Sequence, residues 1–380
     1  MNTKYTKSLV LAGAMAIASL ADAAQYVYLS GSTAARSIVY NTIINGATVF
    51  DAAPTVVVQG GKSLSGANYM NFHGNVGGND TILKCHWSGS EAGIADLVGG
   101  TELFLTDIAT TILDGTSPDA TVSSPVDLAM ADNAKNYSRN PSVAATGAKV
   151  GIIAFKWVAE KGSAASLTGV TDQSIRAAFA GTAKLALFTG NPADTTRVFV
   201  TGRDSGSGTR VNAYGTCGFG IFSAPSQLQV NLDGSMVDQG GGVYLGDYGY
   251  SSGGTVAAQM GYDLTQATSK DVAPLGDGAS HFSVIAYLGA ADANTAVANG
   301  GTALTYNGVP FSLGAIEEGQ YNYWGNEYIY KKNNGLSTQA GTVFTKLSTG
   351  IPANADNNTL IGTSSMHCTR GGPTSDPVHN

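Results

Sequence analysis

The residues best suited to chemistry lie in one short stretch, Arg203-Asp-Ser-Gly-Ser-Gly-Thr209, which follows an expected strand over 197–200. Its two glycines allow a sharp turn and a close approach of the backbone to a ligand. Its last three residues begin an expected helix, whose unpaired N–H groups and dipole favour an anion. Together with two hydroxyls and one guanidinium, they predict a pocket for a small tetrahedral anion.

Two earlier stretches repeat this order of strand, glycine–serine turn and helix start. Ser30-Gly-Ser-Thr33 follows an expected strand over 26–29, and Ser88-Gly-Ser-Glu-Ala-Gly93 follows one over 83–87. In open α/β sheets, such turns gather at the carboxyl ends of the strands, where ligands bind. We therefore expect the three turns to converge on one anion. Within the second turn, Ser88 and Glu91 have capping-box spacing, so we expect Glu91 to cap a helix and face away from the ligand.

The elements that must position these turns alternate between strands and helices, which predicts an α/β fold with mainly parallel sheets. The segment 149–155 is apolar on both faces, as in a covered parallel sheet. Residues 60–82 are expected to form a glycine- and asparagine-rich loop, and 98–125 show no strong periodicity. Further strands are expected at 55–58, 127–133 and 281–288, and an extended aromatic segment with a role in packing at 319–330. Helices are expected at 34–44, 172–181, 255–260 and 336–348, with a loop at 251–254. The helix at 172–181 would run from an Asp172 cap to a Gly181 stop.

Residues 1–24 are expected to form a cleavable signal peptide, because two lysines precede a short apolar run and an Ala-Asp-Ala site. Without Lys4, Lys7 and Asp22 (net +1), the formal charge goes from −7 to −8. An acidic chain with only 12% charged residues is a poor candidate for nucleic acid or anionic membranes. We expect an exported, periplasmic or secreted protein without a lipidation cysteine.

Three cysteines, Cys85, Cys217 and Cys368, form an odd set for an oxidising compartment. One disulfide and one free thiol are expected, and the pairing is left open. Two of them neighbour histidines, at 85–86 and 367–368, but no Cys-x-x-Cys spacing supports a zinc site. Neither a metal nor a cofactor is expected.

The order of these motifs resembles the periplasmic phosphate-binding proteins of ABC transporters. The resemblance runs through Gly31-Ser-Thr33, Ser88 to Ile94, Ala131-Asp132 and Arg203-x-x-x-Ser-Gly-Thr209, and covers most of the mature chain. It implies a two-lobed binding protein with a hinge that closes on inorganic phosphate, works as a monomer with an inner-membrane permease and is not an enzyme. The implied lobes are 25–148 with 318–380, and 149–317. The implied phosphate ligands are Thr33, Ala34, Ser90, Asp132, Arg203, Ser207, Gly208 and Thr209.

In this comparison, Asp132 would give selectivity. A buried carboxylate repels sulfate but accepts a hydrogen bond from the proton of hydrogen phosphate, and such a mismatch is worth roughly 2–5 kcal/mol. The chain departs from the family at the acid that holds the arginine. The family has this acid two positions after the arginine, where Ser205 stands here, and the nearest acid is Asp204.

Two other functions are compatible with the sequence. An exported surface or matrix protein could keep the binding-protein fold without tight ligand capture. A trypsin-like serine hydrolase is the weaker alternative: Asp204-Ser-Gly-Ser207 is similar to its nucleophile motif, but His73 and His86 lack the expected surroundings.

Overall fold

The computed structural model describes residues 23–45, 48–231, 235–262 and 282–380. The expected signal peptide therefore lies almost wholly outside the described residues. Within the described ranges, no helix combines the length and the apolar character needed to cross a membrane.

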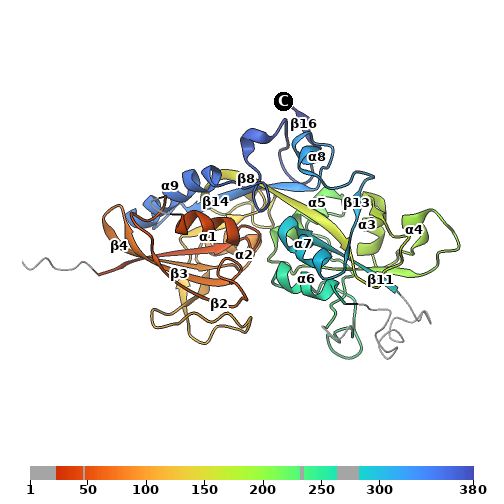
Figure 1. Cartoon of the computed structure of the whole chain (residues 1–380), viewed down its shortest axis with the longest axis horizontal. Helices are drawn as coiled ribbons and strands as arrows, with labels where there is room; N and C mark the ends of the chain where they lie inside the picture. Colours follow the sequence, from red (N-terminus) through yellow and green to blue (C-terminus); the bar gives the residue numbers. More distant parts are fainter. Residues whose placement is uncertain (1–22, 46–47, 232–234, 263–281) are drawn as a thin grey trace, which may run out of the picture.

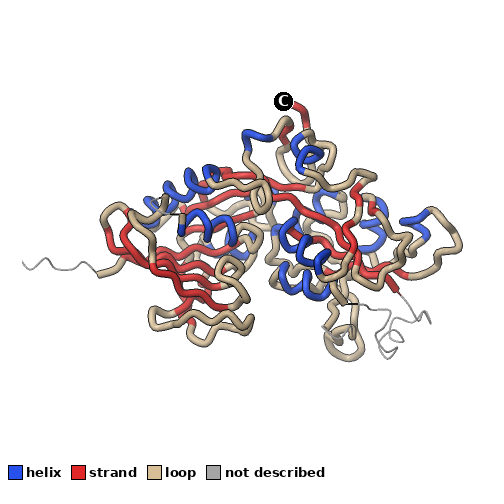
Figure 2. The backbone as a smooth tube through the Cα atoms, viewed as in Figure 1, coloured by secondary structure: helices blue, strands red, loops and turns tan. Residues whose placement is uncertain are grey.

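The chain forms a mixed sheet of ten strands flanked by helices (Figures 1 and 2). The strand order is β10-β11-β8-β14-β7-β1-β4-β3-β2, with β12 also on β8. The strands are β1 (Gln25–Gly31), β2 (Thr55–Gln59), β3 (Tyr69–Val76), β4 (Asn79–His86), β5 (Thr101–Leu105), β6 (Thr121–Pro125), β7 (Leu128–Ala131), β8 (Ala145–Ala159), β9 (Gly169–Val170), β10 (Arg197–Thr201), β11 (Phe282–Gly289), β12 (Thr302–Ala303), β13 (Thr305–Tyr306), β14 (Trp324–Lys332), β15 (Cys368–Thr369) and β16 (Val378–His379). The helices are α1 (Arg36–Ile44), α2 (Ser90–Asp96), α3 (Asp172–Phe179), α4 (Ala186–Thr189), α5 (Gly208–Thr216), α6 (Gly253–Met260), α7 (Ala290–Ala298), α8 (Leu313–Glu317) and α9 (Thr338–Ala353), with short 3-10 turns η1 (Lys135–Tyr137) and η4 (Thr363–Ser365).

The molecule has two lobes, joined by the long strand β8 (Figure 1). The first part of β8 pairs with β14, and its last residues pair with β11 of the other lobe. The first lobe holds β1–β7, α1, α2 and α9, and the second holds β10, β11 and α3–α7. Where the lobe boundaries fall along the chain stays a prediction.

In the first lobe, helices cover both faces of the sheet. Ile38 and Val39 of α1 and Leu347 of α9 belong to the large apolar core on one side. Ile94 of α2 packs on the other side in a smaller cluster that includes Tyr330 of β14. Covering both faces explains why the central strands are apolar throughout.

The second lobe has the same arrangement. Trp157 of β8 and Tyr287 of β11 pack against Phe179 of α3 on one face of the sheet. The neighbouring strand residues Val158 and Leu288 point to the opposite face, where they pack against α6 and α7. This alternation fixes which strand residues reach each helix layer.

The three strands before the first-lobe turns are parallel, so their carboxyl ends meet. β1 pairs with β4 up to Ser30–His86 and with β7 up to Gly31–Met130. In the second lobe, β10 and β11 are parallel in the same way. The turns after β1 and β4 therefore leave the sheet at neighbouring strand ends, whereas the turn after β10 leaves it in the second lobe.

The α/β class and most elements agree with the sequence predictions, but the sheet contains more antiparallel pairs than expected. β8 is antiparallel to both β14 and β11, not part of a covered parallel sheet. Instead of a loop over 60–82, the hairpin β3–β4 turns at Gly77-Gly78. The segment 98–125 contains a second hairpin, β5–β6. Thr171, not Asp172, caps α3, whereas Gly181 does follow its end with φ +73°.

The expected disulfide is wrong. All three cysteines are buried free thiols, and they lie on different elements: β4, the end of α5 and β15. Burial raises the pKa of the Cys217 thiol to about 12 and also raises the pKa of Cys85. These side chains therefore behave as small apolar groups of the core.

Gly31 is the glycine on which the first turn depends. Its φ is +115°, and a Cβ placed there would lie 2.1 Å from the carbonyl oxygen of Met130. We expect Gly31→Ala to lower the free energy of unfolding by about 2 kcal/mol or more, since it adds backbone strain to a clash with a strand. Gly78→Ala is the matched control: its φ is +81° with no atom within 4 Å of the added Cβ. It should cost only about 1 kcal/mol. Equal losses in urea unfolding would contradict this account.

Candidate functional site

The buried carboxylate of Asp132 lies where the turns converge. It follows β7 and is 2% exposed. Its Oδ1 accepts a hydrogen bond from Ser32 Oγ, and its Oδ2 accepts one from Thr209 Oγ1 at 3.2 Å. Its backbone N–H donates to Ser90 Oγ at 3.1 Å, and its carbonyl accepts from Asn212 Nδ2 at 3.1 Å. Asp132 thus contacts three chain segments from both lobes.

Arg203 supplies the positive charge, and backbone carbonyls hold it. Nε donates to Tyr250 O at 3.0 Å, Nη2 to Ser251 O at 2.6 Å, and Nη1 to Thr33 Oγ1 at 3.0 Å. Burial lowers the pKa of the guanidinium, and the nearby acids Asp204 and Asp292 oppose that shift. Because a guanidinium has five N–H groups, two remain available to an anion.

The start of α5 brings the third turn against the second. A Cβ on Gly208 would lie 2.4 Å from Ser90 Oγ, so only glycine allows this approach. Gly206 O accepts a hydrogen bond from Glu91 N at 2.9 Å, which joins the loop before α5 to the start of α2. Ser207 Oγ caps α5 by accepting from Arg210 N at 3.4 Å.

Three hydroxyls of the site accept a hydrogen bond and donate none among the described residues. Thr33 accepts from Arg203, Ser90 from Asp132 N, and Ser207 from Arg210 N. Each therefore keeps its O–H for a ligand. The first two N–H groups of α5 have no acceptor in the described part of the chain either. The site holds many free donors around one carboxylate.

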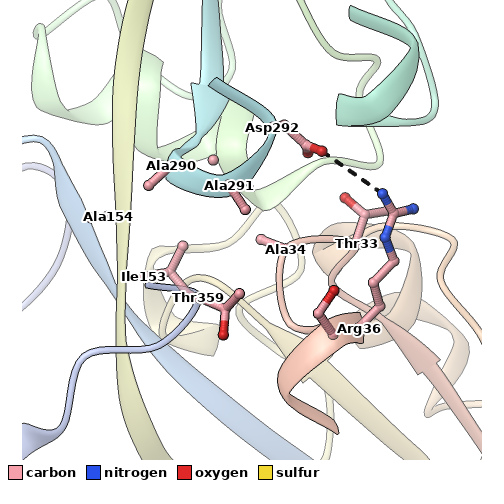
Figure 3. Close-up of a pocket in the computed structure, with 11 residues that line it drawn as sticks. Thr33, Ala34, Arg36, Ile153, Ala154, Ala290, Ala291, Asp292 and Thr359 are labelled. Carbon is pink, nitrogen blue, oxygen red and sulfur yellow. Dashed lines mark ion pairs between the residues drawn. The ribbon is translucent and has the colours of Figure 1, made fainter. Parts of the chain in front are cut away.

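The eight predicted ligand residues lie close to one another. The contacts above join Thr33 with Arg203 and, separately, Ser90 with Asp132, Gly208 and Thr209. Ser32, the chain neighbour of Thr33, links the two groups through its bond to Asp132. Ser207 is next to them at the cap of α5. Ala34 lines a neighbouring cavity of about 40 Å³ together with Thr33 (Figure 3).

That cavity lies between the lobes. In Figure 3, Thr33, Ala34 and Arg36 of the first lobe face Ala290 and Asp292 of the second. Arg36 Nη2 and Asp292 Oδ1 form an ion pair 3.8 Å long across the gap. The cavity is large enough for a few water molecules.

One sequence prediction about an acid near the site is wrong. Glu91 does not cap α2: Gly89 occupies the cap position, and the Glu91 carboxylate accepts from Asn133 Nδ2 at 3.0 Å and from Arg139 N at 2.6 Å. Asp204, the acid next to Arg203, accepts a hydrogen bond at Oδ1 from Gly206 N, and the guanidinium donates to carbonyl oxygens of residues 250 and 251.

Sequence reasoning also missed residues that build the site. Ser32 lies in the first of the three turns and is not among the predicted ligand residues, yet it donates a hydrogen bond to Asp132. The segment 251–254 is no simple loop: Ser252 caps α6, and the Ser251 carbonyl holds Arg203. Tyr287 accepts from Arg203 N at 3.0 Å and fixes the backbone there. By contrast, the aromatic residues Tyr321, Tyr323 and Trp324 are buried in the core, as expected for packing.

The largest omission is Glu327. This β14 side chain is fully buried, and neither carboxyl oxygen has a hydrogen-bond donor among the described residues. Burial, and then the carboxylate of Asp132, raise the pKa of Glu327 well above its usual range. The signal in the sequence was a single acid inside an aromatic and apolar strand.

The histidines near the site have other partners. His73 Nε2 lies 2.8 Å from Asp80 Oδ1, and His86 Nδ1 lies 3.0 Å from Glu102 Oε1. A serine hydrolase would need a histidine at the Ser207 hydroxyl, whereas this hydroxyl contacts Arg210 N. Among the described residues, no group of three or more histidines, cysteines or acids could hold a metal ion.

Comparisons with known proteins found no matching family model and no matching curated sequence. Solved structures are similar at low identity. A protein from Clostridium perfringens, assigned as a phosphate ABC transporter substrate-binding protein and solved with phosphate, is 13% identical with a TM-score of 0.49, over 89% of this chain and 100% of that one. PstS from Borrelia burgdorferi is 15% identical (TM-score 0.43, 89% and 98%), and a phosphate transport receptor from Vibrio cholerae 11% (TM-score 0.43, 84% and 93%).

Glu327 makes stability depend on pH. Below about pH 4.5 the acid is protonated in both the folded and the unfolded chain; above it, only the unfolded chain releases the proton. Because the folded pKa is raised, the contribution of Glu327 to stability falls by up to about 1.4 kcal/mol for each pH unit. Glu327→Gln should therefore gain stability relative to the wild type between pH 5 and pH 7 in urea unfolding. Asp376→Asn, at an exposed carboxyl, is the control. If the free energies of unfolding of the wild type and Glu327→Gln differ by the same amount at every pH, Glu327 is not a buried neutral acid.

Proposed function

We propose that the protein is an exported solute-binding protein that captures inorganic phosphate between its two lobes for uptake through an ABC transporter. The observation that carries this proposal is the balance between hydrogen-bond donors and acceptors in the site. Free hydroxyls, two guanidinium N–H groups and a helix N-terminus surround the carboxylate of Asp132.

Hydrogen phosphate suits this balance. Its oxygens would accept from Thr33, Ser90, Ser207 and the Arg203 fork, with charge-assisted bonds at the arginine. Its one proton would be donated to Asp132. Sulfate at neutral pH has no proton to give, so its oxygen would face a buried carboxylate. The geometry thus favours a protonated tetrahedral anion.

Binding between the lobes would couple capture to closure. Several contacts already join them: Arg203 with Thr33, Thr209 with Asp132, and Gly206 O with Glu91 N. Closure of two lobes around a ligand removes water and strengthens each hydrogen bond. The long strand β8 runs through both lobes and is a suitable place for the hinge.

The same contacts favour a second candidate, an exported surface or matrix protein without tight ligand capture. Thr33 and Arg203 bond to each other, as do Thr209 and Asp132, so part of the site is satisfied without a ligand. Calorimetric titration of the mature protein separates the two candidates. Micromolar or tighter phosphate binding supports capture, whereas no heat with either phosphate or sulfate supports the scaffold.

Arg203→Ala should abolish measurable phosphate binding in that titration. The variant removes both free N–H donors and the buried charge, which together are worth several kcal/mol. Arg139→Ala is the matched control, since only the backbone N–H of Arg139 bonds to a residue near the site. Circular dichroism should show a folded chain in both variants. Unchanged phosphate affinity in Arg203→Ala would remove the arginine from the pocket.

Asp132→Asn should reduce the difference between the affinities of the protein for phosphate and for sulfate. An asparagine keeps the shape of the side chain but no longer repels an unprotonated oxygen, so sulfate affinity should rise as phosphate affinity falls. A change of about tenfold or more in the affinity ratio is expected, since one mismatched buried group is worth over 1.4 kcal/mol. An unchanged ratio would contradict the role of Asp132 in selection.

A further inference from the structure

Glu327 lies directly across the sheet from Asp132. β14 and β7 are antiparallel, and Tyr328 pairs with Ala131, so the next register position places Glu327 opposite Asp132. A Cβ on Gly325, two residues earlier, would lie 2.4 Å from the Asp132 carbonyl oxygen, which shows how closely β14 passes beneath the site. The pairing of β14 with β8 also changes register between Glu327 and Tyr328. The extra residue of this bulge is Val150 of β8, because Glu327 pairs with Gly151 and Tyr328 pairs with Lys149.

A buried carboxylate in this position would be unstable. Glu327 is 0% exposed and has no donor for either oxygen among the described residues. The titratable group that it faces is another acid, Asp132. Two acids in one buried space share protons instead of both ionising. A proton on Glu327 also gives it a donor, and Asp132 is the acceptor next to it.

The acceptor positions of Asp132 can be counted. A carboxylate offers about four lone-pair positions. Ser32 occupies one on Oδ1 and Thr209 one on Oδ2. A proton from Glu327 would occupy a third, which leaves one for a ligand.

We propose that Glu327 is a specificity-determining positioning residue: its neutral carboxyl donates to Asp132, orients it and leaves one acceptor position for a single ligand proton. This inference rests on the proposed function and deepens it. Asp132 then selects tetrahedral oxyanions that carry one acidic proton and discriminates against those with none. Glu327 itself touches no ligand and acts through Asp132.

The experiment compares Glu327→Gln with Glu327→Met. Glutamine keeps a donor for Asp132, and methionine has a similar length without one. Tyr328→Phe, at the adjacent position of β14, is the control. Calorimetry with inorganic phosphate and with sulfate gives both affinities. A second measurement follows the side-chain carboxyl ¹³C signal of Glu327, assigned by its loss in the glutamine variant, in wild type and in Asp132→Asn.

We expect Glu327→Gln to keep the phosphate-to-sulfate affinity ratio of the wild type. Glu327→Met should lower that ratio by about tenfold or more, the effect of one lost charge-assisted hydrogen bond. An unchanged ratio in the methionine variant, with phosphate binding intact in the wild type, would overturn the inference and leave the proposed function standing.

The carboxyl signal decides the case in which the wild type binds neither anion, or in which the methionine variant does not fold. A protonated Glu327 at pH 7, whose signal moves in Asp132→Asn, supports the shared proton. An ionised Glu327, or a signal that does not respond to Asp132→Asn, overturns the inference. Absence of phosphate binding in the wild type overturns the proposed function alone.

Discussion

The structure around the cleft depends on keeping one carboxylate, Asp132, hydrogen-bonded away from bulk water. Burying an unpaired charge costs several kcal/mol, so every nearby segment contributes a partner. Ser32 and Thr209 donate to its oxygens, and its backbone groups contact Ser90 and Asn212. These partners come from both lobes, so the same requirement that satisfies the acid also brings the lobes together.

The buried positive charge of Arg203 likewise has hydrogen-bond partners around it. Within the described residues Arg203 forms no ion pair, and carbonyl oxygens of residues 250 and 251 hold it. Neutral acceptors fix the guanidinium without cancelling its charge, which leaves more of that charge for an incoming anion. Asp292, on α7, contributes at longer range and pairs with Arg36 across the lobes.

Much of this site could be predicted from local sequence, because each turn is specified by neighbouring residues. An expected strand followed by glycines and serines marks each of the turns at Gly31, Ser90 and Gly208, and no distant residue is needed to recognise it. What could not be predicted depends on pairing between distant strands. The direction of β8 is hidden by its apolar residues on both faces, and the hairpin β3–β4 was missed because its glycine-rich turn hid an alternating strand pattern. Glu327 escaped notice since its partner lies across the sheet and far away in sequence.

The register change at Glu327 has a mechanical consequence. The extra residue of this bulge, Val150, lies on β8, the strand that runs through both lobes. A bulge bends the strand that holds it and increases the local twist. β8 therefore bends beside Glu327, so the angle between the lobes and the position of the two neighbouring acids depend on the same short stretch of backbone.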